Sequence, residues 1–200
     1  HYGDTVVLST ATASDKPRQG IDYFPLSVEY NEKLDAVGKI PGGFNKREGK
    51  ASENAVLTCR VIDRPMRPLF PKDYRNDVTL ENLVLSVEQD CSPELTAMLG
   101  SAIATAISDI PFDGPTATTQ VGLIDGEFVF NPTSAQRQVS DMALTVASTR
   151  EKVIMIEAGA NEVPEDKMIE AIFAAHEVNQ QVIAFIDKIV AECGKEKHSY

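Results

Sequence analysis

The chain has 200 residues, of which 42% are hydrophobic and 24% are charged, and its formal net charge at pH 7 is −11. This composition is typical of a globular protein, and the length suffices for one good-sized domain or two small lobes with a shared core. No run of about 18 or more apolar residues exists, which excludes a membrane-spanning helix.

The cysteines and the start of the sequence indicate the cellular compartment. Cys59, Cys91 and Cys193 are odd in number and far apart, without metal-binding or redox spacing. We therefore expect reduced thiols in a cytoplasmic protein. No secretory leader is visible. The chain begins without Met, just before a predicted strand, so we expect it to be part of a longer protein.

The first half of the chain alternates between strand and helix patterns. It predicts a strand at 5–12, a polar loop at 14–20, a strand of alternating apolar residues at 24–30 and a longer, more buried strand at 78–88. Ser92, Pro93 and Glu94 supply a cap, a first-turn proline and an acid, and they predict a helix that runs to residue 107.

The second half predicts a hairpin, two further strands and a long helix. Asp125 and Gly126 join strands at 118–124 and 127–130, and strands at 142–148 and 153–157 follow. A helix starts at Pro164 and ends at Gly194, with an apolar stripe made by Met168, Ile172, Ala175, Val182, Ile186 and Ile189. We expect the polar tail at 194–200 to be frayed.

Two β-then-α halves divide near Pro115, so the pattern predicts a mixed α/β fold with some antiparallel pairing. We expect one core domain at 1–193, with lobe 1 at about 1–114 and lobe 2 at about 115–193. No internal repeat is visible.

Residues 39–75 form the one basic segment of this acidic chain. They contain nine of its 19 Lys and Arg against four acids, a local net charge of +5, while the remainder carries −16. Such a concentration of positive charge favours a polyanionic partner. The alternative is a solvated loop and helix face with no partner.

The basic segment has two parts with different chemistry. Glycines flank a loop in which Phe44 could stack on a base while Lys46, Arg47 and Lys50 contact phosphates, as in single-strand RNA binding. Ser52 then predicts a helix cap, and Pro65 and Pro68 predict that the helix ends there. Three arginines, spaced for one helical face, would bind phosphate unless acids neutralise them, and Asp63 is the nearby candidate: Arg60, Arg64 and Arg67.

The sequence IPGGFNKREGKASENAVLTCRVIDRPMRPLFP at 40–71 resembles the first core domain of the bacterial polynucleotide phosphorylase family. In that family the loop usually reads Phe-Phe-Arg-Arg-Glu-Gly-Arg, and the helix ends in Leu-Ile-Asp-Arg-Pro-x-Arg-Pro-Leu-Phe-Pro. The resemblance extends through residues 19–26, 109–115 and 131–133 and covers nearly the whole chain. It implies the ribonuclease PH fold, an α/β fold with a mixed sheet that is related to the second domain of ribosomal protein S5.

The resemblance also implies an activity for the whole protein. The family degrades single-stranded RNA from its 3′ end, with inorganic phosphate as the nucleophile and nucleoside diphosphates as products. Three subunits, each with two such domains, form a ring around a channel. The implied RNA-binding residues at the channel neck are Phe44, Asn45, Lys46, Arg47 and Lys50, and the implied phosphate-facing residues are Arg60, Arg64 and Arg67.

This chain departs from the family pattern in its loop. Asn45 stands where a second Phe is usual, so one stacking platform is lost. Lys46 and Lys50 replace arginines, which keeps the charge but loses the bidentate phosphate fork.

The resemblance assigns catalysis to the other copy of the fold. In the catalytic copy, two Asp and a Lys lie just before and within one strand. The two acids hold the divalent metal ion, and a serine pair elsewhere holds phosphate. The matching strand here is 141–149, with Ala143 and Thr145 at two of those positions and the third near Arg137. Without carboxylates a site binds Mg²⁺ poorly, so no catalytic or metal-binding residue is expected in this domain.

No other motif indicates a catalytic site. His1, His176 and His198 are far apart in the sequence and form no catalytic pattern. Two other functions stay open at this stage. One is a purely structural ring subunit that steers RNA, and the other is transfer of pyrophosphate to guanosine nucleotides.

Overall fold

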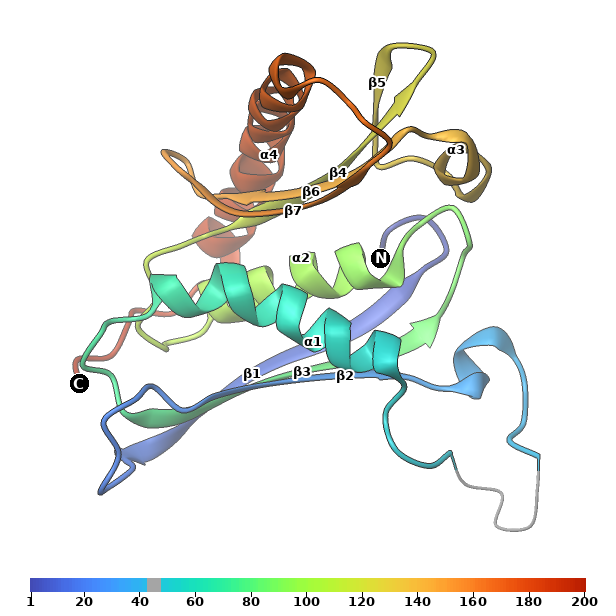
Figure 1. Ribbon diagram of the computed structural model, residues 1–200. Coiled ribbons are helices and arrows are strands. Elements are labelled where there is room, and N and C mark those ends of the chain that lie inside the picture. The colour runs from blue at the N-terminus through green and yellow to red at the C-terminus, as the bar shows by residue number, and fades with distance from the viewer. Residues whose placement is uncertain (43–47) are drawn as a thin grey trace.

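The computed structural model describes residues 1–42 and 48–200, which form four stacked layers (Figure 1). The first layer is a three-stranded sheet of β1 (Val6–Pro17), β2 (Leu26–Glu32) and β3 (Asn76–Ser86). Helices α1 (Glu53–Met66) and α2 (Pro93–Ile107) form the second layer. The third is a four-stranded sheet of β4 (Ala117–Ile124), β5 (Glu127–Phe130), β6 (Met142–Ser148) and β7 (Val153–Ala160). Helix α4 (Glu165–Cys193) covers its outer face.

The two sheets differ in strand direction. In the order β1-β3-β2, β1 is antiparallel and β2 is parallel to β3. In the order β5-β4-β6-β7, all neighbours are antiparallel. The predicted hairpin is confirmed, and Asp125 and Gly126 both have positive φ, at 51° and 83°, as the favoured two-residue hairpin turn requires.

Several element bounds differ from the prediction. Strand β1 extends to Pro17 into the predicted loop, because it stays paired with β3 as far as Asn76. The short helix α3 (Ser134–Val139) was not predicted, because six residues are too few to show helical periodicity. Two 3-10 turns, η1 (Leu34–Val37) and η2 (Arg67–Leu69), complete the described elements.

Helix α2 packs closely on the first sheet through small side chains. Ala97 and Ala102 are fully buried, and a Cβ atom on Gly100 would collide with Ser9 Oγ of β1. Beside this contact, the buried Asn82 of β3 accepts hydrogen bonds at Oδ1 from Ser9 Oγ (2.6 Å) and Ser101 Oγ (3.0 Å). Because buried polar groups need partners, this network fixes how α2 lies on the sheet.

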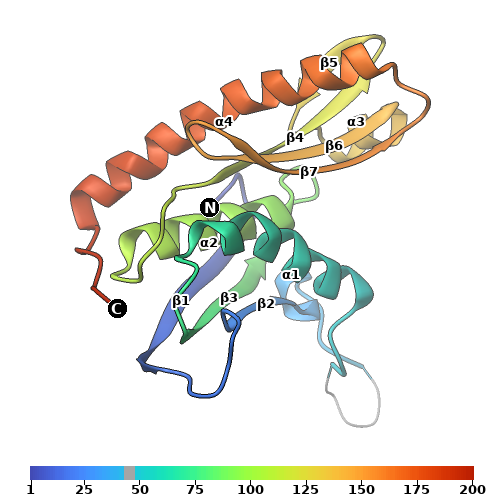
Figure 2. The ribbon, with the colours of Figure 1, turned by 60° about the vertical axis from the view of Figure 1, so that its left-hand side comes forward.

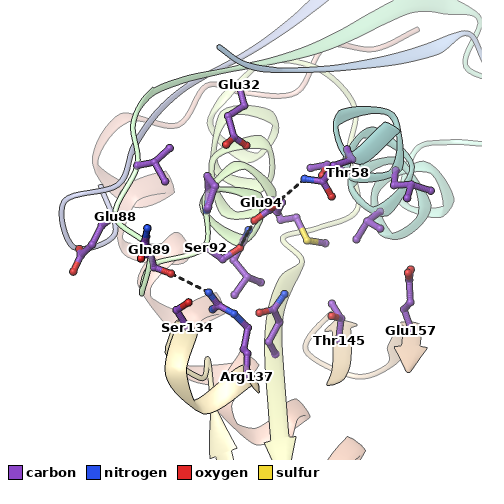
Figure 3. A pocket seen from close by; sticks show the side chains of 18 residues that line it. Glu32, Thr58, Glu88, Gln89, Ser92, Glu94, Ser134, Arg137, Thr145 and Glu157 are labelled. Carbon is purple, nitrogen blue, oxygen red and sulfur yellow. Dashed lines mark hydrogen bonds between the residues drawn. The ribbon is translucent and has the colours of Figure 1, made fainter. Parts of the chain in front are cut away.

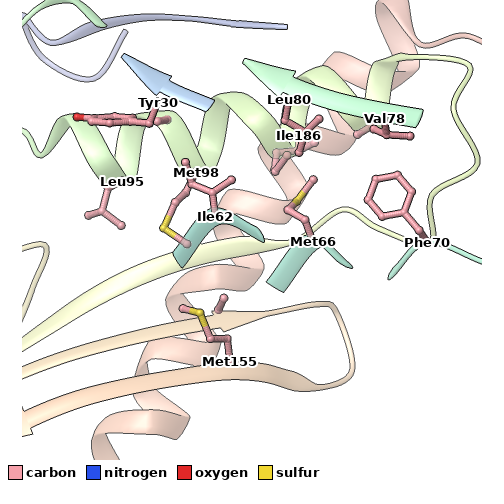
Figure 4. Close-up of a cluster of buried hydrophobic side chains, with 14 of the residues drawn as sticks. Tyr30, Ile62, Met66, Phe70, Val78, Leu80, Leu95, Met98, Met155 and Ile186 are labelled. Carbon is pink, nitrogen blue, oxygen red and sulfur yellow. The ribbon is translucent and has the colours of Figure 1, made fainter. Parts of the chain in front are cut away.

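Among the described residues, one hydrophobic cluster contains side chains from both sheets (Figure 4), and a second lies between the second sheet and α4. Ile62 and Met66 of α1 pack between Leu80 of the first sheet and Met155 of β7 in the second. Ile186, from the far end of α4, joins the same cluster. The helices of lobe 1 are thus held between the sheets of both lobes.

Helix α4 buries the face that its apolar stripe predicted, since every residue of the stripe is buried or partly buried. Ala175 and Ile186 are buried as expected, but Asn179 and Ile183 are buried as well. Asn179 Nδ2 donates to Val146 O (3.1 Å) and Ser148 Oγ (2.9 Å), and its Oδ1 accepts from Thr119 Oγ1 (2.7 Å). This polar anchor, which apolar periodicity cannot reveal, sets the rotation of the helix.

None of the described helices combines the length and apolar composition that crossing a bilayer needs.

The C-terminal tail is docked rather than frayed, which corrects the sequence-based expectation (Figure 2). Lys197 Nζ donates to three carbonyl oxygens at the C-terminal end of α2: Thr105 (2.9 Å), Ala106 (2.9 Å) and Ser108 (2.6 Å). The ends of helices expose such unpaired carbonyls and attract cations. Burial lowers the pKa of the Lys197 ammonium, and the nearby Asp109 opposes this effect.

The Lys197→Met variant should be less stable than the parent chain by about 1–2 kcal/mol, which corresponds to a fall in Tm of roughly 2–8 °C. The reason is the loss of charge-assisted hydrogen bonds to the last turn of α2. Lys195→Met is the matched control, because Lys195 is exposed and its side chain forms no hydrogen bond within the described residues. Thermal unfolding of both variants makes the comparison. Equal Tm values would show that the tail is not docked through Lys197.

Candidate nucleic-acid interface

Helix α1 carries the arginines that the sequence singled out. It begins as predicted at Ser52, whose Oγ accepts a hydrogen bond from Ala55 N (3.1 Å). It continues through Pro65 and ends at Met66, one residue beyond the first predicted end signal. Its buried side faces the core, and Arg60 and Arg64 are exposed on the other side.

Arg67 follows the end of α1 and connects the helix to the first sheet. Its Nε and Nη2 donate to the two carboxylate oxygens of Asp63 (2.9 and 2.6 Å). Its Nη1 and Nη2 also donate to the backbone carbonyls of Phe24 (3.0 Å) and Leu26 (3.3 Å), at the start of β2. Most of the guanidinium's donor capacity is therefore used inside the protein.

Arg64 points toward the other lobe. Its Nη1 lies 2.7 Å from Glu157 Oε2 of β7, and its Nη2 lies 3.5 Å from Ile156 O. The expectation that Asp63 is the one acid near these arginines is wrong, because Glu157 is brought in from 93 residues away. Arg64 and Arg67 thus diverge toward opposite sheets instead of converging on one anion.

Arg60 and Lys50 are the predicted site residues whose charges stay exposed. Within residues 1–42 and 48–200, neither of them forms a salt bridge or a side-chain hydrogen bond. The other predicted RNA-binding residues lie outside the described residues: Phe44, Asn45, Lys46 and Arg47.

A cleft of about 590 Å³ lies between the lobes, bounded by α1, α2, α3, β4, β6 and β7 (Figure 3). Four carboxylates line it: Glu32, Glu88, Glu94 and Glu157. Among the described residues that line the cleft, Arg137 is the sole Lys or Arg, and it donates to the carbonyls of Pro132 (2.7 Å) and Gln89 (2.9 Å). The described lining of the cleft is therefore acidic, and the guanidinium of Arg137 is already hydrogen-bonded to the protein backbone.

Several cleft carboxylates are engaged with neighbouring donors. Glu94 accepts from Ser92 Oγ (2.6 Å) and Asn54 Nδ2 (3.3 Å), which belong to α2's cap and to α1. Glu32 accepts from Tyr30 Oη (2.7 Å), and burial together with this bond raises the pKa of Tyr30. These bonds tie the cleft walls to the core.

Strand β6 presents neither a carboxylate nor an amine to the cleft. Met142, Leu144 and Val146 face α4, so the alternate positions Ala143 and Thr145 lie on the other side, and Thr145 lines the cleft. In the described part of the chain, no three His, Cys, Asp or Glu side chains gather as a metal site would require. The described residues of β6 and the cleft therefore offer no set of donors that fits a divalent metal ion.

Comparison with known families identifies the fold and the relationship. The model of domain 1 of the 3′ exoribonuclease family matches residues 1–111, and that of domain 2 matches residues 114–178. The chain belongs to the 3′ exoribonuclease family. The rice Rrp46 crystal structure, another structure with this fold, superposes with a TM-score of 0.73 at 15% identity over 94% of this chain and 84% of that one. The implied ribonuclease PH fold is confirmed.

Curated members of this exoribonuclease family are much closer in sequence. The polyribonucleotide nucleotidyltransferase of Lachnoclostridium phytofermentans is 87% identical over all 200 residues, which span 29% of its length. That of Clostridioides difficile is 59% identical over 98% of this chain, which spans 28% of its length. The resemblance to polynucleotide phosphorylase is thus confirmed, with this chain matching less than a third of each relative.

Arg67→Ala should lower the free energy of unfolding by about 1–2 kcal/mol, because the Phe24 and Leu26 carbonyls and Asp63 lose a charged donor. Arg60→Ala should change it by less than about 0.5 kcal/mol, since its side chain is exposed. Urea unfolding of both variants tests the distinction. If the two variants were equally stable, Arg67 would not hold α1 to β2.

Proposed function

We propose that this chain is the RNA-binding, non-catalytic first core domain of a phosphate-dependent 3′-to-5′ exoribonuclease. The proposal rests on the contrast between the interlobe cleft and the exposed surface that carries Lys50 and Arg60. Strand β6 has Ala143 and Thr145 where the resemblance places catalytic side chains, and Thr145 lines the interlobe cleft, whereas Lys50 and Arg60 are exposed without acid partners in the described chain. Close polyribonucleotide nucleotidyltransferase relatives support the reaction class.

Binding rests on the basic segment. Lys50 and Arg60 are exposed without acid partners in the described chain, so an RNA phosphate would not have to displace an internal carboxylate from them. In the proposal Lys46 and Arg47 act on phosphates with them, Phe44 stacks on a base and Asn45 offers hydrogen bonds. Arg64, on α1, faces the phosphate backbone of the RNA. Arg67 holds that helix in place.

The chemistry belongs to the remainder of the protein. In the proposal a second ribonuclease PH-like domain of the same polypeptide holds Mg²⁺ and positions inorganic phosphate as the nucleophile. Three copies assemble around a channel in the cytoplasm and turn over messenger RNA. The role of this chain is to bind and orient single-stranded RNA, because its own residues supply no metal ligands on β6.

Replacing Lys50 and Arg60 by Ala should weaken binding of single-stranded oligonucleotides by a similar factor whatever their base sequence. Each phosphate-binding charge that is removed should reduce the slope of log affinity against log salt by about 0.7, because fewer counterions are released. Fluorescence anisotropy of a labelled oligonucleotide at several salt concentrations measures both effects. Lys195→Met, which removes an exposed charge outside the basic segment at 39–75, is the control.

Two outcomes, one of the binding titration and one of an activity assay, separate this proposal from its alternatives. An unchanged affinity and slope in the Lys50 and Arg60 variants would exclude this surface as the RNA contact. Release of nucleoside diphosphate from poly(A) by this chain, with phosphate and Mg²⁺ present, would contradict its non-catalytic assignment.

Phe44→Ala should cost about 1–3 kcal/mol of binding free energy per stacked base while leaving the salt slope nearly unchanged, because stacking releases no counterions. Asn45→Phe should strengthen binding by restoring the second platform. The same anisotropy titrations, with Tm measured in parallel, test both. A Phe44→Ala variant with lower Tm but intact affinity would show that the ring has a structural role instead.

A further inference from the structure

The salt bridge between Arg64 and Glu157 joins α1 to the acidic cleft. Arg64 belongs to α1 in lobe 1, and Glu157 belongs to β7 in lobe 2 and also lines the cleft. Figure 3 shows Glu157 extending from its strand toward α1. The Nη1–Oε2 distance is 2.7 Å, and the two side chains are 48% and 52% exposed.

An exposed pair of this kind is weak and can exchange partners. Water screens the attraction between half-exposed charges, and such pairs contribute little to stability. Arg64 forms one strong bond, to Glu157, and one long contact of 3.5 Å to a carbonyl, so one bond has to be exchanged before a phosphate can take the place of the carboxylate. Arg67 differs, because four hydrogen bonds to Asp63, Phe24 and Leu26 hold it in place.

The position of Arg64 places it next to the proposed RNA contact. Arg60 lies one helical turn before it on α1 and is free of acid partners in the described chain. A phosphate bound at Arg60 is therefore within reach of the neighbouring turn, since residues four apart on a helix are neighbours. Glu157 occupies the guanidinium that such a phosphate would otherwise bind.

We infer that Glu157 is a built-in competitor of RNA for Arg64. An RNA phosphate binds Arg64 by displacing the Glu157 carboxylate, so this carboxylate sets how tightly α1 binds RNA. The inference rests on the proposed function, and it adds a residue from lobe 2 to the determinants of RNA affinity. Displacement also breaks an ion pair between the lobes, so RNA binding and the contact between α1 and β7 are coupled.

Glu157→Gln tests the competition because it removes the charge and keeps the size of the side chain. The variant should bind a single-stranded oligoadenylate of about 12 nucleotides, a length typical of single-strand binding folds, more tightly than the parent chain. The gain should be about two- to fivefold, the strength of an exposed ion pair. In an Arg64→Ala background, Glu157→Gln should have no effect.

Asp187→Asn is the matched control for overall charge. Asp187 of α4 is paired with Arg150, another exposed salt bridge in lobe 2, so this variant also removes one acid and frees one arginine. Unchanged affinity in Asp187→Asn, together with tighter binding in Glu157→Gln, would support the inference. Equal gains in both variants would overturn it, because the effect would then be one of net charge.

The remaining outcomes separate this inference from the function on which it rests. If the parent chain binds RNA through Lys50 and Arg60 but Glu157→Gln binds no more tightly, the competition is refuted and the proposed function stands. A gain in Glu157→Gln that persists in the Arg64→Ala background also refutes it. If no variant shows salt-dependent RNA binding, both proposals fail.

Discussion

The close approach of α2 to the first sheet is the constraint on which the other layers depend. Protein interiors are as densely packed as organic crystals, so a helix can lie between two sheets only if its side chains fill the available space. Helix α2 has small residues on its packed face, Ala97, Gly100 and Ala102, which allow it to lie close to the sheet. Asn82 fixes the position of the helix on β3. A larger residue at position 100 would push the helix off β1 and open the core that both lobes share.

The placement of α1 follows from that packing and decides which charges face outward. Ile62 and Met66 anchor the helix between the sheets, and this orientation leaves Arg60 exposed. The same orientation sends Arg64 toward lobe 2 and Arg67 toward lobe 1. One helix thereby connects both sheets through its polar side chains as well as its apolar ones, and the basic surface is supported by the core beneath it.

Features that depend on a few neighbouring residues could be predicted from the sequence. The Asp125-Gly126 turn and the caps at Ser52 and Ser92 follow from local geometry, and all three form as expected. Asp63, four residues before Arg67, was a candidate partner from the sequence, but the partners of the arginines that lie far away in the chain could not be predicted in the same way. Glu157 becomes a neighbour of Arg64 only after the lobes meet, and the Phe24 and Leu26 carbonyls carry no sequence signal because every residue has one. The docking of Lys197 escaped prediction for the same reason.

The burial of Asn179 restricts which changes in chain length α4 can accept. Each residue advances an α-helix by about 100°, so deleting one residue between Glu165 and Asn179 would require the amide to turn away from Val146 and Ser148 or the first half of the helix to rotate. The loop at 161–164 is exposed or partly exposed and can absorb an insertion without turning the helix. Over evolution, insertions and deletions in this part of the chain should therefore collect before Glu165, while the spacing from there to Asn179 stays constant.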